Sequence, residues 1–72
     1  MMVPVEIMVL AENVKRLRHR RKLSQSQLGQ RTGIHFSEIS RIERGLRDSR
    51  LTTIARLAHG LRVKPARLLE GP

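Results

Sequence analysis

The sequence predicts a single all-α domain, and three observations support this prediction. Apolar residues recur at helical spacing along most of the chain, from about Leu10 onward. Glycines stand where these segments end, at Gly33, Gly45 and Gly60, and Ser24 stands where one of them begins. No strand pattern occurs beyond a short alternation near the N-terminus. At 72 residues, the chain is close to the lower size limit for a domain that supports its own core.

The first nine residues differ from the rest in their periodicity. Apolar side chains alternate here with a period of two, which predicts an extended segment. The alternating residues are Val3, Val5, Ile7 and Val9. We therefore expect residues 1–9 to form an N-terminal arm and residues 10–70 to form the domain. The arm is either partly ordered or a β-arm that pairs with a second subunit, with Pro4 at its edge.

The first helix is expected from about Leu10 to near Lys22. Leu10, Val14 and Leu17 share one helical face, so the helix is amphipathic. The other faces are strongly basic, and cations in the last turn suit the negative end of the helix dipole. These basic residues are Lys15, Arg16, Arg18, Arg20 and Arg21.

The second helix has a clear start and a clear end. Ser24 is followed three residues later by Gln27, which is the pattern of a capping box. Gly33 is expected to end the helix in a left-handed conformation, which glycine adopts without a steric penalty.

The remaining elements follow from caps and terminators. A third helix is expected over Phe36–Arg44, with His35 as its N-cap and Gly45 as its terminator. A fourth helix is expected to run from Leu51 and close at Gly60. A fifth, short helix opens at Lys64-Pro65, because proline is favoured at the first helical position.

The second and third helices have the spacing of a helix-turn-helix. Gly29 lies where the two helices approach closely, and Gly33 permits the sharp turn between them. The apolar positions expected to pack between the helices are Leu28, Ile34, Ile39 and Ile42. This arrangement leaves the third helix projecting, with its N-terminal residues free to enter a major groove. An ordinary corner between two helices, with no ligand, would not require a strongly basic chain.

Charge and composition indicate the partner. The formal net charge is +9 and the pI is near 11.9, which favours a polyanion. Phe36 is the single aromatic residue, whereas proteins that stack on single strands need several. The sequence therefore favours double-stranded DNA.

Other classes of function are disfavoured. The chain has no cysteine, and its three histidines lack the spacing of a zinc site, so no metal or cofactor is expected. No nucleophile is paired with a base, and no carboxylate pair suggests an enzyme. The N-terminal segment lacks the order and length of a secretory signal, and no segment is long enough to span a membrane. We expect a cytoplasmic protein that does not bind membranes.

Three stretches resemble a known family. LSQSQLGQRTG, ISRIERG and LTTIARLAHGLRVKPARLL are similar to the Cro and phage-repressor type of helix-turn-helix, also called the xenobiotic-response-element family. The resemblance covers roughly Leu10 to Leu69. It implies a five-helix, lambda-repressor-like DNA-binding domain. It also implies a sequence-specific transcriptional regulator, of repressor type, that binds a near-palindromic operator as a dimer.

The same resemblance assigns roles to individual residues. Those that match the base-contacting positions are Phe36, Ser37, Ser40 and Arg41. Arg41 can bond both acceptors of a guanine. Phe36 replaces the usual polar residue and could pack on a thymine methyl, against the domain surface or against a partner. Those expected near phosphates are Gln25, Thr32, His35, Arg44, Arg47 and Arg50. Arg18 and Glu43 match a largely buried ion pair.

The sequence predicts a dimer but leaves more than one class of binding partner open. A homodimer is expected, since one helix-turn-helix contacts only a half-site. The candidate interface residues are Leu61, Val63, Leu68 and Leu69, together with the arm. One alternative is an antitoxin or adaptor module that binds a partner protein, and another is a nonspecific, nucleoid-type DNA binder. Small regulators of this kind include repressors and the controllers of restriction–modification systems.

Overall fold

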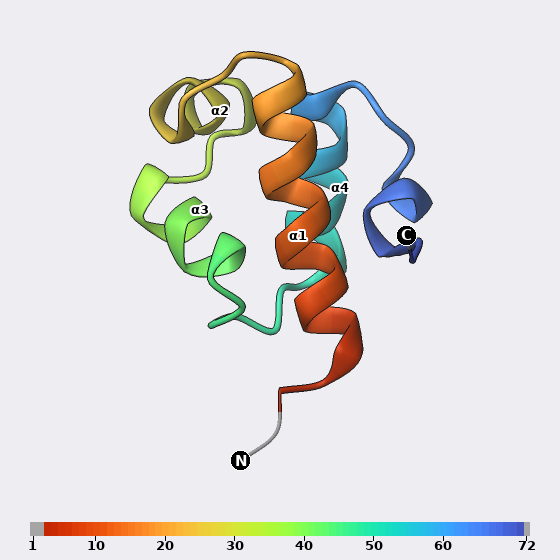
Figure 1. Cartoon of the computed structure of the whole chain (residues 1–72). Helices are drawn as coiled ribbons and strands as arrows, with labels where there is room; N and C mark the ends of the chain where they lie inside the picture. Colours follow the sequence, from red (N-terminus) through yellow and green to blue (C-terminus); the bar gives the residue numbers. More distant parts are fainter. Residues whose placement is uncertain (1–2, 72) are drawn as a thin grey trace.

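The computed structural model describes residues 3–71 of the chain, and within them all regular structure is helical (Figure 1). The elements are α1 (Val5–Arg20), α2 (Gln25–Thr32), α3 (Phe36–Glu43), α4 (Leu51–Leu61) and the 3₁₀ helix η1 (Pro65–Leu69). The predicted all-α fold is confirmed. The expected fifth helix is a single 3₁₀ segment, with Pro65 in its first turn as predicted.

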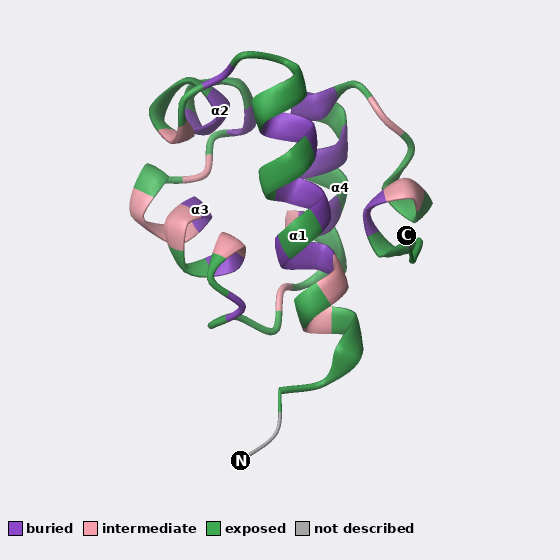
Figure 2. Cartoon of the chain, in the orientation of Figure 1, coloured by how far each residue is buried: buried purple, intermediate pink, exposed green. Residues whose placement is uncertain are grey.

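The helices α1 and α4 lie side by side, with α2 and α3 on one side of them and η1 on the other (Figure 1). Each helix turns its apolar face inward, so the buried residues form one continuous core (Figure 2). The core residues are Leu10, Val14, Leu17, Leu23, Leu28, Ile39, Ile42, Ile54, Leu57, Ala58, Leu61 and Leu68. Among residues 3–71, no helix has both the length and the apolar character needed to cross a bilayer.

The predicted extended arm is wrong for the part that the structure describes. The first helix begins at Val5, where the carbonyl of Pro4 accepts hydrogen bonds from the amides of Ile7 and Met8 at 3.0 and 3.4 Å. Ile7 is half-buried and continues, at helical spacing, the buried face that includes Leu10. Packing of this face therefore overrides the strand preference of alternating β-branched residues. Residues 1–2 lie outside the described range.

The end of α4 also differs from the prediction. The helix continues through Gly60 to Leu61, and Arg62 ends it in the left-handed region at φ 60°. Gly60 has a packing role instead, because a Cβ atom there would lie 2.6 Å from Cγ2 of Thr32 in α2. The glycine thus permits the close approach of α2 and α4 and does not terminate the helix.

Burial removes two residues from the predicted dimer interface. Leu61 and Leu68 are both 0% exposed and belong to the core, so neither can contact another subunit. Val63 is half-buried against the same core. Leu69 is 45% exposed and is the one exposed residue among these four.

A buried asparagine fixes η1 to α1. The Asn13 side chain is 4% exposed, and its Nδ2 donates to the carbonyls of Leu68 at 2.8 Å and Glu70 at 3.0 Å. Its Oδ1 accepts from Arg16 at 2.7 Å. Every polar atom of this amide is therefore in use, as a buried polar group requires.

Candidate nucleic-acid interface

The turn between α2 and α3 is held by local interactions. Ser24 Oγ accepts from the amide of Gln27 at 3.0 Å, and Gln27 Oε1 accepts from the amide of Ser24 at 2.8 Å. This is the predicted capping box, and it fixes the start of α2. Gly33 then adopts φ 74°, the left-handed conformation that was expected of it.

Gly29 sets the distance between α2 and the turn. A Cβ atom at this position would lie 2.6 Å from the carbonyl oxygen of Ile34 and 3.5 Å from the amide nitrogen of Phe36. Both are backbone atoms, so a larger residue would push the start of α3 away from α2. The small residue therefore determines where the first turn of α3 lies.

His35 organises the tip of α3. The amide of Ser37 donates to His35 Nδ1 at 3.2 Å, and Ser37 Oγ lies 2.8 Å from the same nitrogen. The imidazole is therefore the predicted N-cap. Its ring also lies beside the ring of Phe36, with centroids 4.6 Å apart. These contacts hold Phe36 at the first position of the helix with half of its surface exposed.

One side of α3 faces the core and the other faces solvent. Ile39 and Ile42 are almost completely buried, as predicted. The four predicted base-contacting residues lie away from this buried pair, with Phe36 and Arg41 exposed and Ser37 and Ser40 half-buried. The exposed part of α3 thus combines an aromatic ring, two hydroxyls and a guanidinium, which together suit the polar edges and methyl groups of a major groove.

A buried ion pair joins α1, α2 and α3. Arg18 donates from Nε to Glu43 Oε2 at 2.6 Å and from a terminal nitrogen to Oε1 at 2.9 Å, and another terminal nitrogen donates to the carbonyl of Leu23 at 2.8 Å. The two side chains are 10% and 4% exposed. Gln25 Nε2 also donates to Glu43 Oε1, at 3.1 Å. The network therefore connects the start of α2 with the end of α3.

Thr32 is not available for a phosphate contact. Thr32 is 9% exposed, and its hydroxyl donates a hydrogen bond to the carbonyl of Leu28 at 2.9 Å. The same hydroxyl accepts from the amide of Ile34 at 3.2 Å. The prediction for Thr32 is wrong, because the side chain is used to close the turn inside the domain.

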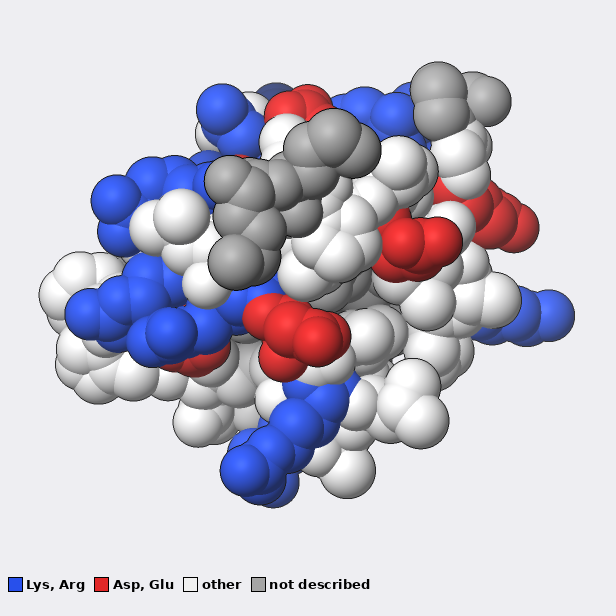
Figure 3. All heavy atoms as spheres, turned by 90° about the horizontal axis from the view of Figure 1, so that it is seen from below, with Lys and Arg blue, Asp and Glu red and all other residues white. Residues whose placement is uncertain are grey.

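The arginines assigned to phosphates differ in their surroundings. Arg44 and Arg50 are exposed next to the ends of α3 and α4. Arg47 is exposed but donates to both oxygens of Glu38, at 3.1 and 3.0 Å. Glu38 also lies 3.8 Å from Arg41. In the view from below, Lys and Arg side chains form several groups around the molecule, and the largest group is on the left, the side where α3 lies in Figure 1 (Figure 3).

Sequence reasoning missed the role of Glu38 and of two further arginines. The Glu38–Arg41 spacing of three residues could have predicted a helical ion pair, whereas the contact between Glu38 and Arg47 arises from the path of the loop.

The two arginines lie at the end of α4. Arg21 donates to the carbonyl of Leu61 at 2.9 Å, and Arg31 donates to that of Gly60 at 3.4 Å. Both therefore cap the end of α4.

In residues 3–71, no group of histidine, aspartate or glutamate side chains is placed to hold a metal ion. An open hollow of about 500 Å³ lies between α2 and the tip of α3, and Ser26, Gln30 and Phe36 are among the residues that line it. The exposed Phe36 at the tip of α3 therefore forms part of the wall of this hollow.

The capped second helix, the left-handed glycine and the outward-facing third helix define a helix-turn-helix domain. Comparison with known proteins agrees, since the sequence profile described as "Helix-turn-helix domain" matches residues 9–70. The chain belongs to this family.

The chain is also similar to individual proteins. It is 39% identical over 61 residues to the control protein C.SmaI of Serratia marcescens, a match that covers 85% of this chain and 73% of that protein. The structure superposes with a TM-score of 0.85 on the restriction-modification controller protein C.AhdI from Aeromonas hydrophila, at 29% identity, covering 90% of this chain and 98% of that one.

Two further solved structures are similar. A transcription factor described as hypothetical, NHTF from Neisseria, gives a TM-score of 0.89 at 29% identity and covers all of this chain and 86% of its own. An HTH_3 family transcriptional regulator from Vibrio cholerae gives 0.85 at 28% identity, covering 89% of this chain but 36% of its own. These matches confirm the predicted class, a DNA-binding helix-turn-helix regulator.

Proposed function

We propose that this protein is a controller-type transcription regulator that acts in the cytoplasm, without enzymatic activity. It binds a near-palindromic operator in double-stranded DNA as a homodimer and represses transcription. The class of regulator is supported by the relatives described as a control protein and a restriction-modification controller protein. DNA binding is supported by the basic charge and by the exposed face of α3.

The observation that supports sequence-specific binding most directly is that both ends of α3 are held in place. Its axis is fixed at one end by the His35 cap and at the other by the buried Arg18–Glu43 pair. Phe36 and Arg41 project from this fixed frame. A rigid element with a small number of polar and apolar groups on one face is what direct contact with base edges requires.

Phosphate contacts supply affinity and position. Arg44 and Arg50 have exposed side chains near the ends of α3 and α4, where they can reach the DNA backbone. In this proposal Arg47 approaches the backbone only if a phosphate replaces Glu38 as its partner. Gln25 is half-buried and uses one N–H of Nε2 to donate to Glu43, so the second N–H of Nε2 is left for a phosphate.

A selection from random duplex DNA, read by sequencing, tests the proposal. We expect one enriched site with two related half-sites, since each copy contacts one half-site. Affinity for this site should fall steeply with salt, because phosphate contacts release counterions. If scrambled duplex competes as well as the selected site, the protein is a nonspecific binder. If no duplex binds at low salt, an adaptor function replaces this proposal.

Two variants separate base contacts from phosphate contacts. Arg41→Ala should weaken binding to the selected site by about 1–3 kcal/mol and leave nonspecific binding nearly unchanged. Arg44→Ala is the matched control, and it should weaken both kinds of binding equally and reduce the salt slope by about one. Equal losses on both kinds of DNA for Arg41→Ala would contradict its role in contacting bases.

A further inference from the structure

An acidic side chain lies on the part of α3 that is proposed to enter the major groove. Glu38 comes three positions before Arg41, and its carboxylate lies 3.8 Å from a terminal nitrogen of that arginine. The other carboxylate of α3, Glu43, is used in the buried pair with Arg18. A carboxylate that approaches DNA is repelled by the phosphates of every sequence. Glu38 therefore weakens DNA binding unless the DNA offers it a hydrogen-bond donor.

The loop after α3 orients this carboxylate. Arg47 Nε donates to Oε1 of Glu38 at 3.1 Å and to Oε2 at 3.0 Å. The side chains of Glu38 and Arg47 are 35% and 46% exposed, so the pair lies at the surface. A carboxylate has about four acceptor sites, so further sites on Glu38 are left for another donor. Glu38 is thus an oriented acceptor directly beside Arg41.

Glu38 and Arg41 together complement the major-groove edge of a G·C pair. Guanine presents two acceptors there, N7 and O6, and cytosine presents a donor, its N4 amino group. Arg41 is proposed to donate to a guanine, and a glutamate can accept from the cytosine amino group. An A·T pair also has an amino group, but its adenine has the single acceptor N7. A neighbouring guanidinium and carboxylate therefore suit G·C pairs best.

The position of Glu38 also has a structural effect that must be separated from DNA recognition. Glu38 lies in the first turn of α3, where a negative charge favours the helix. That effect does not depend on DNA sequence. We propose that Glu38 is a specificity-determining residue, which accepts a hydrogen bond from the N4 amino group of a cytosine at or next to the guanine that Arg41 contacts. This inference rests on the proposed function.

The first test uses the operator obtained by selection and measures binding by fluorescence anisotropy. Each cytosine of one half-site is replaced in turn by N4-methylcytosine, which keeps the pair with guanine but covers the N–H that faces the groove. One of these replacements should weaken binding of the unmodified protein by about tenfold and leave binding of Glu38→Ala nearly unchanged. 5-Methylcytosine at the same position is the matched control, because it also adds a methyl group to the groove but keeps the N–H.

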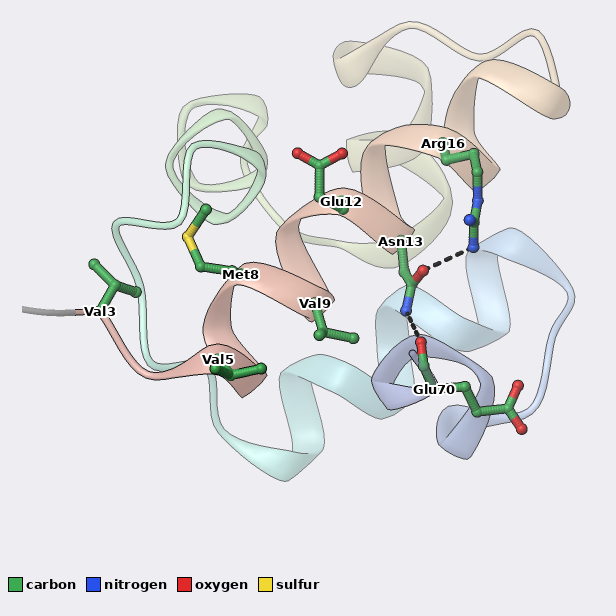
Figure 4. Close-up of a pocket in the computed structure, with 8 residues that line it drawn as sticks. All are labelled: Val3, Val5, Met8, Val9, Glu12, Asn13, Arg16 and Glu70. Atoms are coloured by element: carbon green, nitrogen blue, oxygen red, sulfur yellow. Dashed lines mark hydrogen bonds between the residues drawn. The ribbon is translucent and has the colours of Figure 1, made fainter. Parts of the chain in front are cut away.

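The second test uses scrambled duplex DNA in the same assay. Glu38→Gln removes the charge and keeps the size of the side chain, so affinity for scrambled duplex should rise by about fivefold. Glu70→Gln is the matched control and should change this affinity by less than about twofold. Glu70 also lies 3.8 Å from an arginine three positions away, Arg67, but on the other side of the molecule from α3. Its backbone carbonyl, which the substitution keeps, accepts the hydrogen bond from Asn13 (Figure 4).

Thermal unfolding followed by circular dichroism checks the fold of each variant. Glu38 lies outside the core, so its variants should remain folded. The inference is overturned if no cytosine shows this dependence on Glu38, or if Glu38→Gln leaves the affinity for scrambled duplex unchanged. An equal loss by Glu38→Ala on the operator and on scrambled duplex would show a structural role alone and would also overturn it. Failure to select any operator would overturn the proposed function as well, and it is seen before any cytosine is replaced.

Discussion

Replacement of Arg18 by alanine tests how α3, the helix proposed to enter the major groove, is held in place. Arg18 makes two hydrogen bonds to Glu43 and one to the carbonyl of Leu23, and the Glu43 side chain is 4% exposed. The variant leaves a buried carboxylate whose remaining partner in this network is the amide of Gln25. Removing one partner of a buried ion pair costs about 3–5 kcal/mol. A domain of this size has roughly 4–11 kcal/mol of total stability, so the loss should be large.

The assay is urea unfolding of the single and double variants, followed by helical circular dichroism. Arg18→Ala should lose about 3–5 kcal/mol in unfolding free energy. Replacing both partners, with Arg18→Met and Glu43→Leu, removes the uncompensated charge and should restore most of that loss. The reasoning fails if Arg18→Ala costs less than about 1 kcal/mol, the range of an exposed pair. It also fails if the double variant loses as much as the two single variants together.

Three further predictions concern separate parts of the molecule. Gly29→Ala should lower the free energy of unfolding and weaken operator binding, because the Cβ atom of the alanine would lie 2.6 Å from the carbonyl oxygen of Ile34. Gln30→Ala, on the same helix, is the control. Asn13→Ala should lower the midpoint of thermal unfolding, because it leaves the buried carbonyl of Leu68 without its donor at a cost of about 1–3 kcal/mol. An unchanged midpoint would show that water replaces the amide. In the selected operator, replacing the thymine that faces Phe36 with uracil removes one methyl group and should weaken binding about fourfold in each half-site. Phe36→Gln should abolish this difference, and an equal effect of uracil on both proteins would rule out the methyl contact.

The base-contacting set could be predicted because it depends on helix register. Once Ser24 and Gly33 fix α2 and the turn, the residues that follow His35 can only begin the next helix. Their helical spacing then separates the buried Ile39 from the exposed Arg41. The residues of this chain that match the base-contacting positions of the family could be identified from the same helix register. Whether they contact bases stays a prediction.

The phosphate and interface residues were less predictable because exposure depends on distant parts of the chain. Thr32 has the polarity of a surface residue, yet α4 packs on it through Gly60, 28 positions away in sequence. Leu61 and Leu68 resemble leftover apolar residues until α1 and η1 close the core around them. The identity of a residue as arginine likewise did not show that Arg21 caps α4 whereas Arg44 is exposed to solvent.

The sequence by itself determined the helical elements from α2 onward, the capping box, the left-handed Gly33 and the family. The caps, turns and helix spacing depend on residues within about four positions of one another or on the backbone freedom of one residue, and the family follows from their order along the chain. The tertiary structure alone decided that α1 begins at Val5, that Gly60 lies inside α4, and which basic side chains are free to meet DNA. Those outcomes depend on which surfaces pack together, and burial of apolar area across the whole chain outweighs local strand preferences of about 1 kcal/mol.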